Sequence, residues 1–137
     1  MKQYTTDKLR NVALVAHGGA GKTTLAEALL FRSGATKRLG SVDEGTSILD
    51  YDPEEVKRKI SITTSVAPIE WKNHKINILD TPGYFDFVGE VIGSLRVADA
   101  AVVVVCATNG VEVGTEKVWG YVDDRELPRM VFINKME

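Results

Sequence analysis

Apolar runs separated by glycine-rich or polar stretches predict that strands and helices alternate along this chain. Short apolar or alternating runs predict strands at residues 11–16, 60–71, 75–79, 101–105 and 130–133. Apolar residues at helical spacing predict helices at residues 22–32, 88–98 and 115–127. The second and third strands would form a hairpin, and strands alternate with helices after it. We therefore expect an α/β fold in which helices cover both faces of a mostly parallel sheet.

The same periodicity predicts helix faces. One face of the first helix carries Leu25, Ala28, Leu29 and Arg32. The inward face of the last helix is expected to carry Val118, Tyr121 and Val122. Between the first helix and the hairpin, residues 36–59 lack periodicity. A structureless stretch longer than about 15 residues is unusual in a compact domain, so this one is expected to be a functional loop.

Composition narrows the class of protein. A chain of 137 residues, 44% of them hydrophobic, suits one globular domain. The net charge of −2 does not suit a stand-alone polyanion binder, so we expect no autonomous nucleic-acid binding. Cys106 is the only cysteine and lies in an apolar run, which is typical of a buried residue in a cytoplasmic protein. We find no signal peptide and no run long enough to span a membrane.

The strongest chemical signal is the stretch AHGGAGKTT at residues 16–24. It fits the phosphate-loop pattern G-x-x-x-x-G-K-[ST], with Ala16 in place of the first glycine, and it joins a predicted strand to a predicted helix. Glycines let backbone N–H groups wrap around phosphate oxygens, and the helix N-terminus adds partial positive charge. Lys22 would pair with the β- and γ-phosphates, and the Thr23 hydroxyl would bind Mg²⁺. The nucleotide-binding residues expected here are His17, Gly18, Gly19, Ala20, Gly21, Lys22, Thr23 and Thr24.

A second motif, Asp80-Thr81-Pro82-Gly83, follows the apolar run INIL. The Asp80 carboxylate, at the end of a strand, could hold Mg²⁺ through water. Gly83 could present its N–H to a γ-phosphate and move when that phosphate leaves. Alone this motif would be an ordinary turn, but beside a phosphate loop it indicates a nucleotide site.

A third motif, Asn134-Lys135-Met136-Glu137, follows the apolar strand MVFI. The Glu137 carboxylate could accept both N–H donors on the edge of guanine, which adenine lacks. Each such charge-assisted bond contributes roughly 1.5–3 kcal/mol. Asn134 and Lys135 would also contact the base. All three motifs lie at predicted carboxyl ends of strands, where ligands bind in sheets of this kind.

The chain resembles elongation factor G and its bacterial elongation factor G-like paralogues over nearly its whole length. The resemblance rests on AHGGAGKTTLAEALL, GSVDEGTS, KRKISITTS, INILDTPGYFDFVGEV, RVADAAVVVV, GVEVGTEKVW and FINKME. It implies a P-loop GTPase fold that binds GTP or GDP with Mg²⁺. It also implies that residues 36–64 form the first switch and that residues 80–90 begin the second.

Several positions depart from the pattern of these factors. Ser61 stands where they have a threonine that binds Mg²⁺, so the metal set implied is Thr23, Ser61 and Asp80. Lys59 replaces a glycine, which would stiffen the loop. Glu137 replaces an aspartate, and its extra methylene moves the carboxylate by about 1.5 Å.

Tyr84 is the largest departure, because the factors have there a histidine that positions the attacking water. A phenol, with a pKa near 10, is no base at neutral pH. It could still orient water, since phosphoryl transfer needs positioning more than proton removal. We therefore expect Tyr84, Gly83 and Lys22 at the reacting phosphate. The alternative is that Tyr84 only packs over the switch.

The resemblance implies the ribosome as the partner that stimulates hydrolysis. A complete domain of this type would continue past residue 137, so we interpret the chain as a C-terminally truncated GTP-binding domain from a larger protein. Its strand MVFIN would then be an apolar sheet edge that could pair with another copy.

Three alternatives stay open. Ribosomal protection proteins and release factor 3 share most of these motifs, although Tyr84 favours the elongation factor G-like paralogue over the main translocase. A regulatory or ribosome-docking module with little catalysis is permitted by Tyr84 and Lys59. An ATPase is the third.

Overall fold

The computed structural model describes residues 2–137 of the chain. Its elements follow the sequence in this order: η1 (Thr6–Lys8), β1 (Leu9–Val15), α1 (Lys22–Arg32), α2 (Pro53–Arg58), β2 (Ser65–Trp71), β3 (His74–Asp80), η2 (Phe85–Phe87), α3 (Val88–Val97), β4 (Ala100–Cys106), α4 (Val113–Asp123) and β5 (Arg129–Asn134). The segment of residues 36–64, called the first loop below, joins α1 to β2 and contains α2.

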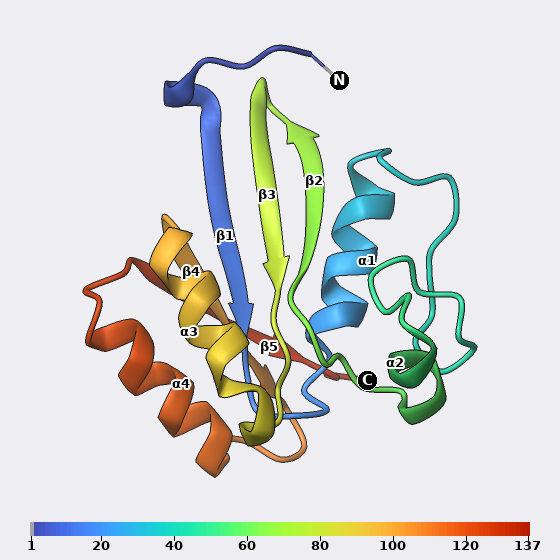
Figure 1. The fold of residues 1–137 in the computed structure, drawn as a ribbon, viewed down its shortest axis with the longest axis vertical. Helices are drawn as coiled ribbons and strands as arrows, with labels where there is room; N and C mark the ends of the chain where they lie inside the picture. Colours follow the sequence, from blue (N-terminus) through green and yellow to red (C-terminus); the bar gives the residue numbers. More distant parts are fainter. Residues whose placement is uncertain (1) are drawn as a thin grey trace.

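The strands form one sheet in the order β2-β3-β1-β4-β5. Strands β3, β1, β4 and β5 are parallel, and β2 pairs antiparallel with β3 as the predicted hairpin. Helix α1 covers one face of the sheet, and α3 and α4 cover the other (Figure 1). The α/β three-layer fold with a mostly parallel sheet is therefore confirmed.

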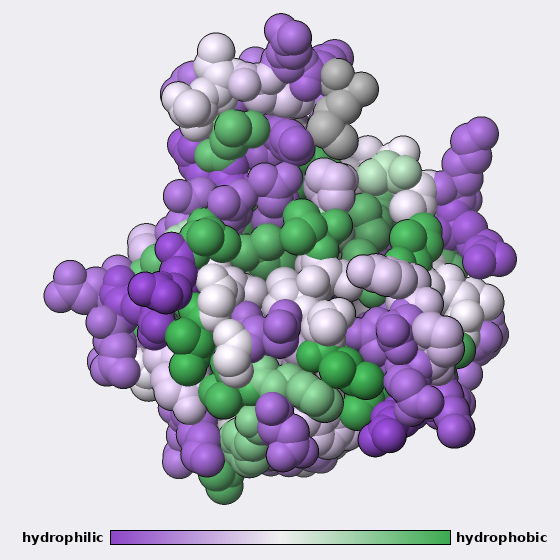
Figure 2. Space-filling model, viewed as in Figure 1, coloured by the Kyte–Doolittle hydropathy of each residue, from purple (hydrophilic) through white to green (hydrophobic). Residues whose placement is uncertain are grey.

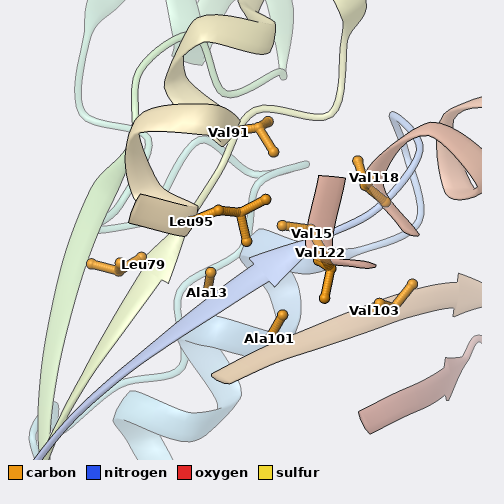
Figure 3. Close-up of a cluster of buried hydrophobic side chains, with 9 residues drawn as sticks. All are labelled: Ala13, Val15, Leu79, Val91, Leu95, Ala101, Val103, Val118 and Val122. Carbon is orange, nitrogen blue, oxygen red and sulfur yellow. The ribbon is translucent and has the colours of Figure 1, made fainter. Parts of the chain in front are cut away.

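The larger core lies between the sheet and the helices α3 and α4 (Figure 3). Because side chains alternate along a strand, Ala13 and Val15 of β1 point into this core while Leu14 points to the α1 side. The core residues of this layer are Ala13, Val15, Leu79, Val91, Leu95, Ala101, Val103, Val118 and Val122. The inward positions predicted for α4 are confirmed, with Val118 and Val122 buried and Tyr121 packed at the margin.

The face predicted for α1 is only partly the buried one. Leu25 and Leu29 are half-buried against the core, but Ala28 and Arg32 are exposed, whereas Ala26, Glu27 and Leu30 are fully buried. The cause lies at the start of the helix, where Lys22 and Thr23 are both buried. Residues four positions later share their face, so the fully buried stripe runs along these positions, with Leu25 and Leu29 at its margin.

The predicted strand at residues 60–71 is too long, because β2 begins only at Ser65. The apolar alternation of Ile60 and Ile62 resembles a strand, but the backbone there does not pair in the sheet. The N–H groups of Ile62 and Thr63 donate instead to Glu55 Oε1, and that of Thr64 donates to Glu90 Oε2.

Two helical regions differ from the prediction. The first loop was predicted without secondary structure, yet it contains α2, which Asp52 caps by accepting from the N–H of Glu54. Pro53 and the reciprocal contact from Glu55 complete the capping box. Helix α4 spans Val113–Asp123 rather than residues 115–127, because Glu112 caps its start.

The surface carries apolar groups in two settings. On the face that Figure 2 shows, hydrophobic residues gather in the middle and hydrophilic ones dominate the periphery. Strand β5 is an edge strand whose residues Met130, Val131, Phe132 and Ile133 are largely exposed, as the sequence predicted. Pairing of this edge with another copy stays a prediction.

Among the described helices, none is long and apolar enough to cross a membrane.

The packing of α3 gives a first prediction. Leu95 is 1% exposed in the core, so Leu95→Ala is expected to lower the free energy of unfolding by about 2–5 kcal/mol. Val97, on the same helix, is 59% exposed, so Val97→Ala should stay within about 0.5 kcal/mol of the parent. Urea unfolding followed by tryptophan fluorescence measures both. Equal losses for the two variants would show that this face of α3 is assigned wrongly.

Candidate functional site

A cavity of about 290 Å³ lies at the carboxyl ends of the parallel strands. It is bordered by the loop after β1, the loop after β3, the residue after β5 and parts of the first loop. Of the residues expected at the site, it is lined by Gly18, Gly19, Gly21, Lys22, Thr23, Thr24, Ser61, Gly83, Tyr84 and Lys135. The three motifs, far apart in sequence, therefore meet at one place.

The phosphate loop has the backbone that its glycines permit. Gly19 and Gly21 have φ angles of 80° and 94°, in the left-handed region that side chains disfavour. Gly21 directly precedes α1, and its Cα faces the Asn134 side chain so closely that a Cβ would collide with the amide nitrogen. Both the conformation and the contact therefore require glycine at residue 21.

Lys22 is buried at the first position of α1, with 6% of its surface exposed. Loss of hydration lowers the pKa of its ammonium group, while the nearby carboxylates of Asp80 and Asp50 oppose that shift. The ammonium group lies against the backbone of Gly83, where a Cβ would come within 2.5 Å of Nζ. An ammonium group held in this way is placed to meet an anion that enters the cavity.

Asp80 ends β3 and is 1% exposed. Both of its carboxylate oxygens are buried without a hydrogen-bond partner among residues 2–137. Burial raises its pKa to about 7, although the nearby Thr23 hydroxyl and the Lys22 ammonium group oppose that rise. The Thr23 hydroxyl is thus close to the carboxylate without meeting the geometry of a hydrogen bond. The next residue, Thr81, fixes the strand end by donating from Oγ1 to the carbonyl of Leu14 at 2.6 Å. Such an unpaired buried carboxylate would be stabilised by a cation.

Two hydroxyl groups meet beside these carboxylates. Thr23 Oγ1 lies 3.0 Å from Ser61 Oγ, and Ser61 Oγ donates to Asp50 Oδ1 at 2.7 Å. The second oxygen of Asp50 is buried and unpaired within the described chain. Residues 2–137 contain no cluster of three or more His, Cys, Asp or Glu side chains suited to a metal. Hydroxyl and carboxylate oxygens, however, are the ligands that Mg²⁺ prefers, so these residues fit that ion.

Gly83 and Tyr84 pack against the phosphate loop. A Cβ on Gly83 would lie 2.7 Å from Gly18 Cα and 2.9 Å from Gly18 N. The Tyr84 ring lies over Gly18, where a Cβ would be 3.2 Å from Cε2 and Cζ. About half of the tyrosine remains exposed. The ring therefore borders the cavity and also covers the start of the phosphate loop.

The third motif is clamped onto the first. Asn134 Nδ2 donates to the carbonyl of Ala20 at 3.0 Å, and Lys135 Nζ donates to the carbonyl of Gly19 at 2.9 Å. Glu137, expected to contact the base, is exposed and does not border the cavity. These bonds show how β5 supports the phosphate loop.

His17 lies apart from the cavity that its neighbours line. Its Nδ1 accepts a hydrogen bond from the N–H of Gly114 at 3.2 Å, and its Nε2 lies 3.7 Å from Glu112. A Cβ on Gly114 would collide with this ring. In this structure His17 therefore connects the phosphate loop to the start of α4.

Lys59 adopts the left-handed conformation, with φ 55°, at the C-terminus of α2. Its N–H donates to the carbonyl of Glu55, which ends the helix. Glycine is the residue that accepts this backbone most easily, which agrees with the glycine noted for this position in the resembling factors. A lysine here costs roughly 1–2 kcal/mol of backbone strain.

Three buried carboxylates near the site, namely those of Glu27, Asp50 and Glu55, were not predicted from the sequence. Only Asp50 borders the cavity. Glu27 and Glu55 accept hydrogen bonds from the first loop. The Asp-Pro-Glu-Glu stretch at residues 52–55 is a helix-capping signal that could have revealed Glu55. For Glu27 and Asp50 no local pattern was available.

Residues 7–137 match the elongation factor Tu GTP-binding domain family. The chain belongs to this family. Guanine-nucleotide binding is the property that defines it, so the ATPase alternative has no support.

Curated relatives of this GTP-binding domain include the mitochondrial ribosome-releasing factors 2 of two yeasts. The factor from Scheffersomyces stipitis is 47% identical over 137 residues, which is 100% of this chain and 16% of that protein. The factor from Lodderomyces elongisporus is 51% identical over 130 residues, covering 95% of this chain and 16% of that protein. The chain thus spans about one-sixth of the length of these relatives.

Solved structures agree with the fold. A crystal structure of a protein from Thermus thermophilus superposes with a TM-score of 0.88 at 52% identity, covering 90% of this chain and 19% of that one. A bacterial selenocysteine-specific elongation factor superposes with a TM-score of 0.75 at 25% identity, covering 94% of this chain and 20% of that one.

The contact of Gly83 with the phosphate loop gives a second prediction. Gly83→Ala would push a methyl group into Lys22 Nζ and the Gly18 backbone, so we expect it to weaken guanine-nucleotide binding by about tenfold or more. Gly120→Ala in α4 is the control, because a Cβ there meets nothing within 4 Å. Titration with a fluorescent GDP analogue measures both. Unchanged affinity in Gly83→Ala would contradict the close packing described here.

Proposed function

We propose that this domain binds GTP with Mg²⁺ and hydrolyses it as the molecular switch of an elongation factor G-like translation factor. The observation that carries the proposal is the polar cluster beside the glycine loop, in which Lys22, Thr23 and Asp80 are buried and Ser61 is half-buried. An ammonium group, two facing hydroxyls and an unpaired carboxylate together suit a triphosphate and its cation. Backbone N–H groups of residues 18–24 would surround the phosphates.

Mg²⁺ would be held by Thr23, Ser61 and Asp80, with Asp50 as a further carboxylate at the same place. When bound, the ion would neutralise charge on the phosphate oxygens. Lys22 would hold the β- and γ-phosphates through its buried ammonium group. Gly83, which touches Lys22 and Gly18, would offer its N–H to the γ-phosphate.

Base recognition would come from Asn134, Lys135 and Glu137. Asn134 and Lys135 are held against the carbonyls of Ala20 and Gly19, which supports a base pocket beside the phosphate loop. Glu137 is exposed, so its side chain is free to turn toward a guanine edge. Selectivity for guanine over adenine would follow from that carboxylate.

Tyr84 would orient the attacking water by hydrogen bonding from its phenol. Its ring lies on Gly18 beside Gly83, next to the place proposed for the γ-phosphate. Positioning is the main requirement of phosphoryl transfer, so a neutral hydroxyl can contribute without removing a proton. We propose Tyr84, Gly83 and Lys22 as the residues at the reacting phosphate.

The ribosome is the partner we propose. The yeast relatives are named ribosome-releasing factors, and the shared domain is a GTP-binding one. A ribosome contact would stimulate hydrolysis that is slow in the free protein. Those relatives are named mitochondrial, so the cytoplasmic location expected from the sequence stays a prediction.

A second candidate is a nucleotide-dependent ribosome-docking module with little catalysis. Two observations favour it. The Tyr84 ring packs on Gly18 through its carbon atoms, and Lys59 holds the end of α2 in a strained turn. The hydrolysis assay below separates the two candidates.

The proposed metal set gives a third prediction. Ser61→Ala removes one hydroxyl ligand, so binding of a GTP analogue with Mg²⁺ should weaken about ten- to hundredfold while GDP binding changes little. Ser61→Thr keeps the hydroxyl and is the matched control. Calorimetric titration with each nucleotide at fixed Mg²⁺ measures the ratio. A parallel loss for both nucleotides would remove Ser61 from the metal set.

Tyr84 gives a fourth prediction. Tyr84→Phe keeps the ring on Gly18 but removes the hydroxyl, so it should lower single-turnover GTP hydrolysis by about tenfold with nucleotide affinity preserved. The assay is run with and without ribosomes. The parent protein should hydrolyse GTP faster with ribosomes. Absence of stimulation in the parent, with an equal rate in Tyr84→Phe, would favour the docking module.

A further inference from the structure

We propose that Glu27 is a positioning residue that docks the first loop onto α1 and thereby sets Asp50 and Ser61 beside Thr23. This inference deepens the proposed function and rests on it only for the nucleotide readout. The Glu27 side chain is completely buried and does not line the cavity proposed to hold the nucleotide.

The contacts of Glu27 are made with the first loop. Its Oε1 accepts hydrogen bonds from Ser47 Oγ at 2.7 Å, from the N–H of Ile48 at 2.6 Å and from the N–H of Leu49 at 3.2 Å. Hydrogen bonds of this kind to an ionised group are roughly twice as strong as neutral ones. Three consecutive loop residues are therefore held on one helix position.

The buried Glu27 carboxylate forms no ion pair with a cationic side chain within residues 2–137. Glu27 has no exposed surface. Its Oε2 is buried without a hydrogen-bond partner in the described chain, and Gly40 packs against it so closely that a Cβ would collide. A buried carboxylate is costly unless donors reach it. Its charge is therefore stabilised inside the protein only while residues 47–49 stay docked.

Docking by Glu27 has a direct consequence for the site. The next residue after Leu49 is Asp50, which accepts from Ser61, and Ser61 lies against Thr23. Thr23 and Glu27 are four positions apart on α1, so they lie on the same face one turn apart. The first loop is thus attached to one face of α1 at two points. One is Glu27, and the other is Thr23, one turn nearer the start of the helix at the proposed metal site.

Glu55 provides the contrast. It is 1% exposed, and it accepts from the N–H groups of Ile62, Thr63 and Asp52. All of these donors belong to the first loop itself. Glu55 therefore shapes the loop internally, whereas Glu27 joins the loop to the body of the domain.

Hydrogen exchange on the nucleotide-free protein tests the docking without any assumption about function. In Glu27→Ala we expect the amides of residues 48 and 49 to exchange about tenfold faster or more, with those of β1 and β4 unchanged. Glu116→Ala, at an exposed position of α4, is the control. Glu27→Gln keeps one acceptor oxygen and the side-chain volume, so it should exchange at an intermediate rate. Unchanged exchange in both Glu27 variants would overturn the proposal.

A double-mutant cycle with Gly40 isolates the contact. The φ angle of Gly40 is not in the left-handed region, and the three atoms nearest to a Cβ at this position all belong to Glu27, so we expect Gly40→Ala to act through its collision with that side chain. We expect Gly40→Ala to speed exchange at residues 48 and 49 about tenfold in the parent, and to have little further effect in Glu27→Ala. Equal effects in both backgrounds would overturn the proposal. If Glu27→Ala does not fold, the cycle is run in Glu27→Gln, where the effect should be reduced.

The nucleotide readout separates positioning from general stability. Glu27→Ala should weaken binding of a GTP analogue with Mg²⁺ about tenfold more than binding of GDP, because only the triphosphate complex needs Ser61. Equal weakening of both nucleotides would mean that Glu27 is only structural. If the parent binds neither nucleotide, the proposed function fails, and the exchange experiments still decide whether Glu27 docks the loop.

Discussion

The burial of one ammonium group, that of Lys22, is the constraint on which the rest of the structure depends. To bury it, the chain must surround the N-terminus of α1 with the loop after β3 and with part of the first loop. Loss of hydration disfavours the charged ammonium group, and Asp80 and Asp50 offset part of that loss. The close contact leaves no room for a Cβ at residue 83, which explains the glycine after Asp-Thr-Pro.

The same constraint sets the rotation of α1. With Lys22 and Thr23 both turned inward, the helical repeat brings Ala26, Glu27 and Leu30 to the inner face. Ala26 and Leu30 are apolar and join the core between α1 and the sheet. Glu27 is not apolar, so the first loop must supply hydrogen-bond donors to it. The inward position of Thr23 at the phosphate loop thereby determines where Glu27, four residues later, docks the first loop.

Buried charge in this region is unbalanced, because four carboxylates, those of Glu27, Asp50, Glu55 and Asp80, are buried together with one lysine, Lys22. They divide into two kinds. Glu27 and Glu55 each receive several N–H or hydroxyl donors from the first loop, and neither borders the cavity. Asp50 and Asp80 keep unpaired buried oxygens beside two hydroxyls, and burial raises the pKa of both. The unsatisfied charge thus collects where a divalent cation would be most favourable.

How much could be read from the sequence follows from the range of each interaction. Four of the five strands, the ends of α1 and the strand-end positions of the three motifs have clear local patterns, and they lie where those patterns predicted, apart from one or two residues at the strand ends. The first loop depends on contacts between residues that are far apart in the sequence, such as Ser61 with Thr23 and Thr64 with Glu90. The N–H groups of residues 62–64 donate to Glu55 and Glu90 instead of to a neighbouring strand. The alternating stretch at residues 60–64 therefore lies outside the sheet, and the local pattern predicted the wrong element there. Glu27 holds residues 47–49 of this loop and Glu90 holds its last residue, Thr64. The loop residues that border the cavity are Val42, Asp43, Asp50, Lys59, Ile60 and Ser61. Because the contacts of Glu27 and Glu90 need no ligand, a nucleotide would act on this loop through the residues that border the cavity, among them Asp50 and Ser61.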